Sequence, residues 1–571
     1  MTAHQDLDPI TLEIVFNALR SITDETFIAL TKSAYSTNIK ERRDHSTAIC
    51  DLDGRLVVQA ENSLPIHLAS MTGLMASLLA KYDLPDIEDG DLFVANDPHV
   101  AGGTHLPDIN LAMPIFVDDK LSAFVCNIAH HADVGGMAPG SMAGGMSEIY
   151  QEGLRIPVIR LFRRGELVTD ILDLLLLNVR VPLERRGDYF AQISACRLGE
   201  RRLQEVILKH GKAVLTAAYS DIISRTQRRM ADGVESIRDG TYTFSDVMDG
   251  DGLGTFDVEI VVAVHVNGRE ITFDFSGTAD QVKGNINVTL NATQAAVCYS
   301  LKALLDPEIP NNQGVLDAVQ IIAPAGTLVN AVFPAPVAAR ANTCQRIIDV
   351  VLGALAEAFP ERVVAAANGA NTTAVFSGID PRSGASYLYL ETLGGGMGGR
   401  PMKDGKDGVQ VHITNTSNLP IEAIEMEYPL LVEEYSLVTD SAGAGRFRGG
   451  MGLRRVVRPR GHDCIFNGAG ERFRHPPWGL FGGASGGMGR FMLRTIEGER
   501  RLEDKPDQVS IGPGDAVVIE TPGAGGFKPA ADRAPEAIAA DRATGKFSEE
   551  YLNRHYGHLA QTTSKEDTDG G

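Results

Sequence analysis

The sequence predicts a mixed α+β protein of several domains, built from mainly antiparallel, hairpin-connected sheets and long helices. Three observations predict this class. Apolar residues recur at helical spacing in several long stretches, alternating stretches flank two-residue turn signals, and 571 residues suffice for about two to four packed units. Composition shifts near residues 240 and 420 suggest three parts: 1–240, 241–420, and a glycine-rich β region over 421–571 that ends in a charged tail.

The N-terminal elements follow from local patterns. Pro9 suits the first turn of a helix, and the apolar spacing predicts that helix from Ile10 to about Ser33. Thr47–Ala60 alternates around an Asp-Gly pair and predicts a hairpin. Further helices are predicted over Ile66–Tyr82 and over the charged stretch Glu200–Met230.

The rest of the chain alternates between strands, helices and glycine-rich loops. Thr255–Phe275 predicts two strands joined at Asn267-Gly268, a hairpin turn signal. Helices are expected at Thr293–Leu305 and Thr343–Phe359. From about residue 388 the pattern changes to glycine-rich loops between short strands, with a low-order tail after Thr562.

Charge and composition exclude several functional classes. A net charge of −21 argues against nucleic acid as the main partner, because phosphate binding needs basic patches. The sequence has no apolar run long enough for a membrane span and no signal-peptide pattern over Met1–Ile10. Its six cysteines are widely spread, without a CxxC pair, which is typical of reduced thiols. We therefore expect a cytoplasmic protein without membrane association.

A hairpin is predicted in the first quarter of the chain, within a histidine-rich window, His45–His131, that holds six of the fourteen histidines. Apolar runs over Ile109–Val117 and Leu121–Ala129 flank Asp118-Asp119-Lys120 and indicate two strands around a tight turn. Pro114 lacks an N–H group, so it restricts its strand to an edge or a bulge.

The register of this hairpin predicts a metal site. Pairing centred on Asp119 puts Asp108 opposite His130 and His105 opposite Asp133. Cross-strand Cβ atoms lie about 5 Å apart, close enough for two side chains to share a cation. Two imidazoles and a carboxylate are a common ligand set for a catalytic divalent ion. The same groups can also hydrogen-bond to one another without metal, and a register error of one residue would separate them.

Two glycine motifs, one typical of dinucleotide binding and one typical of a nucleophilic serine, do not predict those chemistries here. The run Gly394–Gly399 satisfies GxGxxG, but Arg400-Pro401 is a poor helix start, and a dinucleotide site needs a helix there. Gly483–Gly487 matches GxSxG, again without a convincing helix after it. No GxxxxGK[ST] sequence occurs, so a P-loop is not expected.

Many separate blocks, in one order, resemble the hydantoinase B/oxoprolinase family, whose members are the B-type components of ATP-dependent cyclic-amide hydrolases. The blocks cover nearly the whole chain and lie at residues 38–44, 96–98, 102–108, 130–136, 150–154, 274–278, 309–314, 440–450 and 521–526. The departures are small: Ala442 and Ala524 stand where glycine is common, which puts a tight turn in doubt.

The resemblance implies a two-component enzyme. An A-type subunit would carry ATP and Mg²⁺, in a heterotetramer or larger complex, and this chain would hold a divalent metal such as zinc, manganese or iron. The implied ligands match His105, Asp108 and His130, with Asp44 as the fourth. The implied substrate is a small cyclic amide such as a hydantoin, a lactam or 5-oxoproline, and no residue indicates the size of the ring.

The implied mechanism assigns further roles. ATP would phosphorylate the amide oxygen, and a metal-activated water would then attack the phosphorylated amide. Asp133 or Glu152 could accept a proton, and His131 could orient a metal ligand. Two alternatives remain: a subunit of an ATP-dependent ketone carboxylase of the acetone type, and a non-catalytic scaffold for the A-type partner. Carboxylase subunits of this type are usually longer, and a scaffold needs no clustered histidines.

Overall fold

The N-terminal part of the chain forms a seven-stranded antiparallel sheet. In this computed structural model, which describes residues 7–566, the strand order is β2-β1-β5-β4-β3-β6-β7. The strands are β1 (His45–Cys50), β2 (Leu56–Gln59), β3 (Leu92–Ala95), β4 (Asp108–Val117), β5 (Lys120–His130), β6 (Ile159–Arg163) and β7 (Glu166–Leu167). The predicted hairpin over Thr47–Ala60 is β1–β2.

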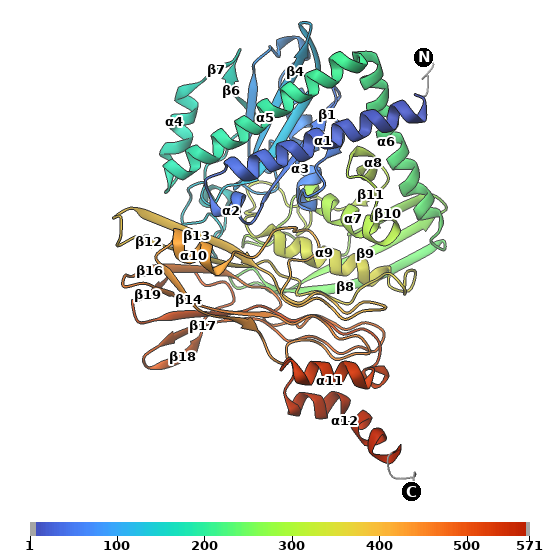
Figure 1. Ribbon diagram of the computed structural model, residues 1–571, viewed down its shortest axis with the longest axis vertical. Coiled ribbons are helices and arrows are strands. Elements are labelled where there is room, and N and C mark those ends of the chain that lie inside the picture. Colours follow the sequence, from blue (N-terminus) through green and yellow to red (C-terminus); the bar gives the residue numbers. More distant parts are fainter. Residues whose placement is uncertain (1–6, 567–571) are drawn as a thin grey trace.

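Helices cover both faces of this sheet. One face packs against α1 and α5, and the other against α3; Figure 1 shows the long helices α1, α5 and α6 at the N-terminal end of the molecule. Where one helix was predicted over Glu200–Met230 there are two, because Gly211 has a φ of +87° and interrupts the helix. The helices are α1 (Pro9–Ser33), α2 (Thr37–Lys40), α3 (Leu68–Lys81), α4 (Thr169–Leu177), α5 (Pro182–His210) and α6 (Lys212–Glu235).

The central β4–β5 hairpin has the predicted register at its open end. Its turn contains only Asp118 and Asp119, with φ of 49° and 58°, instead of three residues. A bulge between Ile115 and Phe116 compensates, so the pairs from Ile115 back to Asp108 keep the predicted centre. Pro114 lies one residue before the bulge and beyond the part of β4 that pairs with β3.

The central region adds a four-stranded sheet, ordered β11-β10-β9-β8, which shares a core with α3 and the following helices. The predicted hairpin is β9–β10, with its turn one residue later, at Gly268-Arg269. These elements are β8 (Gly240–Gly250), β9 (Phe256–Asn267), β10 (Glu270–Asp274), β11 (Gln320–Ile322), α7 (Leu290–Leu305), α8 (Gln313–Leu316) and α9 (Arg340–Ala354).

Two more sheets form the C-terminal half. In the first, ordered β13-β12-β16-β19, the β12–β16 pair joins residues on both sides of position 420. Its strands are β12 (Thr372–Ile379), β13 (Ser386–Leu393), β16 (Cys464–Ala469) and β19 (Val509–Ile511). The second, ordered β14-β15-β20-β17-β18, contains β14 (Leu430–Leu437), β15 (Leu453–Pro459), β17 (Arg490–Thr495), β18 (Gly498–Arg501) and β20 (Ala516–Glu520).

Short helices complete the chain. A low-order tail was predicted after Thr562, but α12 continues to Glu566, so the prediction is wrong for residues 563–566. Residues 567–571 lie outside the described part of the chain. Figure 1 shows α11 and α12 at the end of the molecule opposite α1. The helices are α10 (Ile421–Glu427), α11 (Pro535–Ala543) and α12 (Glu549–Glu566), and the 3₁₀ turns are η1 (Pro65–His67), η2 (Leu84–Asp86), η3 (Ile149–Gln151) and η4 (Ala530–Asp532).

Extended glycine-rich segments pack directly on one another between these elements. We call residues 394–399, 441–452, 483–489 and 521–527 the glycine-rich layer. A Cβ on Gly523 would lie 1.8 Å from Ser441 O, and one on Gly449 would lie 1.9 Å from Ala524 O. Both GxGxxG and GxSxG lie in this layer, where backbone N–H groups bond to neighbouring segments. The glycines of these motifs therefore serve backbone packing.

The cysteines and the helices bear on two expectations drawn from composition. All six cysteines are free and buried. Among the described residues, no helix has the length and apolarity needed to cross a membrane.

Candidate metal centre

Candidate ligands lie in one row at the ends of three neighbouring strands of the N-terminal sheet. Asp108 and His130 are a directly opposed pair at the ends of β4 and β5. On the other side of β5, the N–H of His130 donates to the main-chain oxygen of Asp44 at 3.0 Å, so Asp44 continues the register of β1. Because alternate residues share a face, Asp108 and His130 lie on the face that packs against α3.

The loop before β4 supplies His105. Asp97 caps this loop by accepting hydrogen bonds from the N–H groups of His99 and Val100, and the Nδ1 atom of His105 contacts Ala338 O at 3.1 Å. The Nε2 atom of His105 lies 3.1 Å from Asp108 Oδ1. The loop thus turns the imidazole toward the end of the strand pair.

Potential ligand atoms of His105, Asp108 and His130 all lie within 4.8 Å of one another. All three side chains are buried, and the ring centroids of the two histidines are 4.9 Å apart. The Nε2 atom of His105 and the Oδ1 atom of Asp108 are buried without a hydrogen-bond partner in the described structure. Buried polar atoms normally have hydrogen-bond partners. Potential ligand atoms that converge without such partners are what a site for a divalent cation requires.

The other oxygen of Asp108 is held by the protein. Its Oδ2 accepts hydrogen bonds from Arg340 Nη2 at 2.7 Å and from Thr104 Oγ1 at 3.0 Å. Burial alone would raise the pKa of Asp108, but the neighbouring His105 and Arg340 hold it well below its usual range. Asp108 is therefore ionised, with one oxygen free.

Both histidines of the cluster are neutral near pH 7. Burial, reinforced by the Arg340 charge, lowers the pKa of His105 to about 4. Burial and the neighbouring His105 lower the pKa of His130 well below its usual value. The Asn38 amide holds the His130 ring at Nδ1, 2.8 Å away, and also donates to the His130 main-chain oxygen. Neutral imidazoles are the form that binds metals.

A fourth residue, His67, joins the cluster and was missed from the sequence. It ends η1, its Nδ1 lies 2.9 Å from Ser46 Oγ, and its Nε2 lies 3.8 Å from Asp108 Oδ1. That Nε2 atom is buried and has no hydrogen-bond partner among the described residues. The available signal was its position in the histidine-rich window, directly before the predicted helix over Ile66–Tyr82.

Asp44 lies beside the cluster. Its side chain is buried, and Arg42 Nη2 is 3.9 Å from its Oδ2. Burial raises the pKa of Asp44, and the charge of Arg42 opposes this effect. The group of atoms within 4.8 Å of one another contains His105, Asp108 and His130 without Asp44.

Glu152 is linked to the cluster through one residue. Its Oε1 accepts a hydrogen bond from Ala338 N at 2.7 Å, and the carbonyl of Ala338 contacts His105. Its Oε2 is buried without a hydrogen-bond partner in the described structure. Burial raises the pKa of Glu152 to about 8, so this carboxyl group carries a proton at neutral pH.

His131 and Asp133 have other surroundings. The next residue along β5 after His130, His131, contacts α5: its Nε2 lies 2.9 Å from Gln192 Oε1. Asp133 accepts hydrogen bonds from Gly135 N, Gly140 N and Arg180. The strand pairing ends at Asp108 and His130. The prediction that His105 lies opposite Asp133 in this pairing is therefore wrong.

Known proteins resemble this chain over nearly its whole length. A family model described as hydantoinase B/oxoprolinase matches residues 8–529. The chain is 32% identical to the putative B component of a D-/L-hydantoinase from Pseudomonas sp. strain NS671, over 97% of this chain and 96% of that protein.

Two solved structures have the same fold. An ATP-dependent caprolactamase from Pseudomonas jessenii matches with a TM-score of 0.91 and 29% identity, over 96% of each chain. An acetone carboxylase in its nucleotide-free form matches with a TM-score of 0.87 and 19% identity, over 98% of this chain and 80% of that one. At 19% identity the second likeness is evidence for the fold alone.

Proposed function

Because the chain belongs to the hydantoinase B/oxoprolinase family, we propose that it is the metal-binding catalytic subunit of an ATP-dependent hydrolase of cyclic amides. The partner in this proposal is an A-type subunit that binds ATP. One relative is named as the B component of a hydantoinase and another as the beta chain of a caprolactamase, which supports a two-component enzyme.

The single observation that carries the proposal is the convergence of His105, Asp108 and His130. Two neutral imidazoles and one ionised carboxylate suit zinc, manganese or iron. Unsatisfied atoms of His105, Asp108 and His67 point to the same place, so the residues fit a divalent ion. When bound, such an ion would act as a Lewis acid and make hydroxide available near neutral pH.

The reaction needs an activated amide and a proton for the leaving nitrogen. Transfer of the γ-phosphoryl group of ATP to the amide oxygen, with release of ADP, removes amide resonance. Addition of a water oxygen to the same carbon and cleavage of the C–N bond, with a proton passed to the nitrogen, then give an acyl phosphate and an amine. A second water hydrolyses the acyl phosphate to a carboxylate and phosphate, so one cyclic amide, one ATP and two waters give an amino acid, ADP and phosphate. Of the two candidates for proton transfer, Asp133 and Glu152, we favour Glu152, as a proton donor and not as the acceptor first expected, because it is protonated at neutral pH and has an unpartnered oxygen.

The carboxylase alternative has less support. The chain covers 96% of the caprolactamase chain but 80% of the acetone carboxylase chain. The extra length in the carboxylase matches the expectation that such subunits are longer.

An ATPase screen with the A-type partner present tests the proposal. We expect phosphate release and ring opening with at least one hydantoin, lactam or 5-oxoproline, without bicarbonate. ATP turnover that requires bicarbonate and a ketone would instead establish a carboxylase. A purified chain that holds no divalent metal and adds nothing to its partner's activity would support the scaffold alternative.

A further inference from the structure

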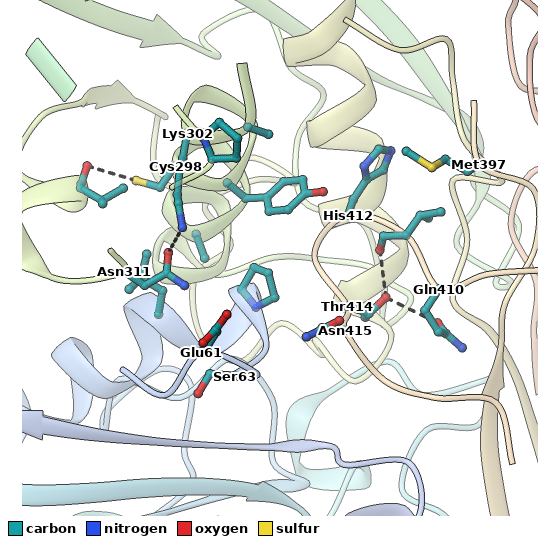
Figure 2. A pocket seen from close by; sticks show the side chains of 18 residues that line it. Glu61, Ser63, Cys298, Lys302, Asn311, Met397, Gln410, His412, Thr414 and Asn415 are labelled. Carbon is teal, nitrogen blue, oxygen red and sulfur yellow. Dashed lines mark hydrogen bonds between the residues drawn. The ribbon is translucent and has the colours of Figure 1, made fainter. Parts of the chain in front are cut away.

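A cavity that is separate from the metal centre lies between η1, α7 and the segment 397–415. Its volume is about 410 Å³, which is within the range of small-molecule sites. His67, His105, Asp108 and His130 do not line it. Figure 2 shows Lys302 and Asn311 on one side of this cavity and His412 on the other, with Glu61 and Ser63 along the bottom.

Lys302 brings an ammonium group to the wall of this cavity without an ion pair. Its Nζ atom donates to Asn311 Oδ1 at 2.9 Å. Within residues 7–566, no carboxylate oxygen lies within the 4 Å of an ion pair with Lys302. Burial lowers the pKa of Lys302, opposed by Glu308 and Asp306. A half-buried cation that is bonded only to a neutral amide favours an anionic ligand, because an anion offsets its desolvation.

One further polar atom in the wall lacks a partner. Ser63 is 3% exposed, and its Oγ makes no hydrogen bond in the described structure. The Nε2 atom of His412, which is 8% exposed, makes no hydrogen bond either, but it faces Asp349 Oδ1 at 3.5 Å. The His412 ring lies edge-on to Tyr299, with the ring centroids 5.9 Å apart. Buried unsatisfied groups are costly unless a ligand or water completes them, so this wall also indicates a polar ligand.

The charges that line the cavity distinguish a carboxylate from a phosphate. No arginine lines this cavity and Lys302 is its one lysine, although Lys302 and Asn311 also line an adjoining cavity that contains Arg20, Arg225 and Arg229. A phosphate group, with nearly two negative charges, is usually bound by several cations or by a helix N-terminus. Glu61 also lines the cavity and would repel a dianion, but it can attract an ammonium group.

The cavity and the metal centre share one wall. Ser63, Pro65 and Leu68 line the cavity, whereas His67, in the same short segment, faces Asp108. A molecule held in the cavity would therefore lie against the segment that positions His67.

We propose that this cavity is a second ligand site, which binds a small amino acid by pairing its carboxylate with Lys302. The ring-opened product of a cyclic amide has this chemistry, with a carboxylate and an amine. This identification of the ligand as a ring-opened product rests on the proposed function. The pairing of a carboxylate with Lys302 does not depend on that function.

The test is calorimetric titration of the full-length, chelator-treated chain, without ATP or partner. The probes are linear ω-amino carboxylates of three to six carbons, the matching alkylamines and inorganic phosphate. We expect one amino carboxylate to bind per chain, and the amines and phosphate not to bind. Lys302→Met should weaken binding by at least about tenfold and Lys302→Arg much less, while the exposed Lys209→Met serves as a matched control without effect.

A second variant guards against misfolding. Asn311→Asp keeps the size of the side chain and places a carboxylate beside Lys302, so it should abolish binding by forming an internal ion pair. His105→Ala should still bind the probe. Loss of binding in His105→Ala but not in Lys302→Met would move the ligand to the metal centre and overturn the proposal, as would binding of phosphate alone or of no probe. Because ATP hydrolysis is not measured, failure here leaves the ring-opening proposal intact, and the reverse also holds.

Discussion

Asp108 and His130 lie directly opposite each other on β4 and β5, and each is the residue at which its strand meets the site. Their proximity is thus a property of sheet register, while His105 and His67 come from adjoining turns. Experiments can separate the register from the ligands themselves.

Deletion of Ala112 should reduce metal binding although every ligand remains. The deletion shifts the residues before it by one position against β5 and turns Asp108 to the opposite face. Replacing Asp118-Asp119 with Asn-Gly, which suits the positive φ angles there, should leave metal content nearly unchanged. Metal per folded chain is measured for both variants. Equal metal content would show that distant segments assemble the site without the register.

His105→Ala should abolish turnover by the complete enzyme while the chain still folds and assembles with its partner. The imidazole comes from a loop held mainly by backbone contacts, so its loss should affect bound metal more than packing. Metal content, circular dichroism and co-purification with the partner are the measurements. A variant that keeps its metal but no longer assembles would contradict the ligand assignment.

His67→Ala should lower metal affinity by about tenfold or more, and by more than Asp44→Asn does. The reason is that His67 Nε2 is unpartnered and 3.8 Å from Asp108 Oδ1, whereas Asp44 lies outside the closest group of ligand atoms. Competition with a fluorescent chelator measures both affinities. The opposite order would restore Asp44 as the fourth ligand.

Glu152 should make the metal-free chain less stable as pH rises. Its pKa is about 8 in the folded chain against an ordinary 4.5, so the folded state binds the extra proton between these values. The free energy of unfolding should therefore fall from about pH 4.5 to about pH 8, since each pKa unit corresponds to about 1.4 kcal/mol. Urea denaturation should show a flatter profile for Glu152→Gln. Identical profiles would mean that Glu152 is ionised in the folded chain.

The isolated chain should hydrolyse no ATP. Its GxGxxG run uses Gly396 N and Gly399 N to bond Pro522 and Gly525 in the neighbouring segment, and the next helix begins only at Ile421. Phosphate release should appear only after addition of the A-type partner. Clear activity of the partner-free chain would contradict the assignment of ATP to the other subunit.

Local patterns predicted the fold class and the strand pairing that brings two candidate ligands together. Hairpin arithmetic correctly paired Asp108 with His130, because the bulge after Ile115 compensates for the shorter turn. The helix break at Gly211 was not predicted, and the turn at Gly268-Arg269 was predicted one residue too early, since both depend on the backbone conformation of single residues.

Long-range contacts were beyond the reach of sequence patterns. Arg340 contacts Asp108 across 232 positions, and no local spacing encodes such a pair. His67 was missed for a related reason: its role depends on how η1 packs against the end of β4, and its spacing from His105 matches no ligand motif. The raised pKa of Glu152 likewise depends on its burial in the folded chain, which the hydrogen bond from Ala338 N opposes.

The glycine-rich layer has a consequence for how the C-terminal half comes apart. Its amides pair across segments that are distant in sequence, as in Gly443 N to Ala524 O and Gly525 N to Ala366 O. No segment can leave without exposing the backbone of its neighbours, so local fraying is suppressed. Amide hydrogens across the whole layer should exchange with solvent at one common slow rate, and the layer should open as a single cooperative unit.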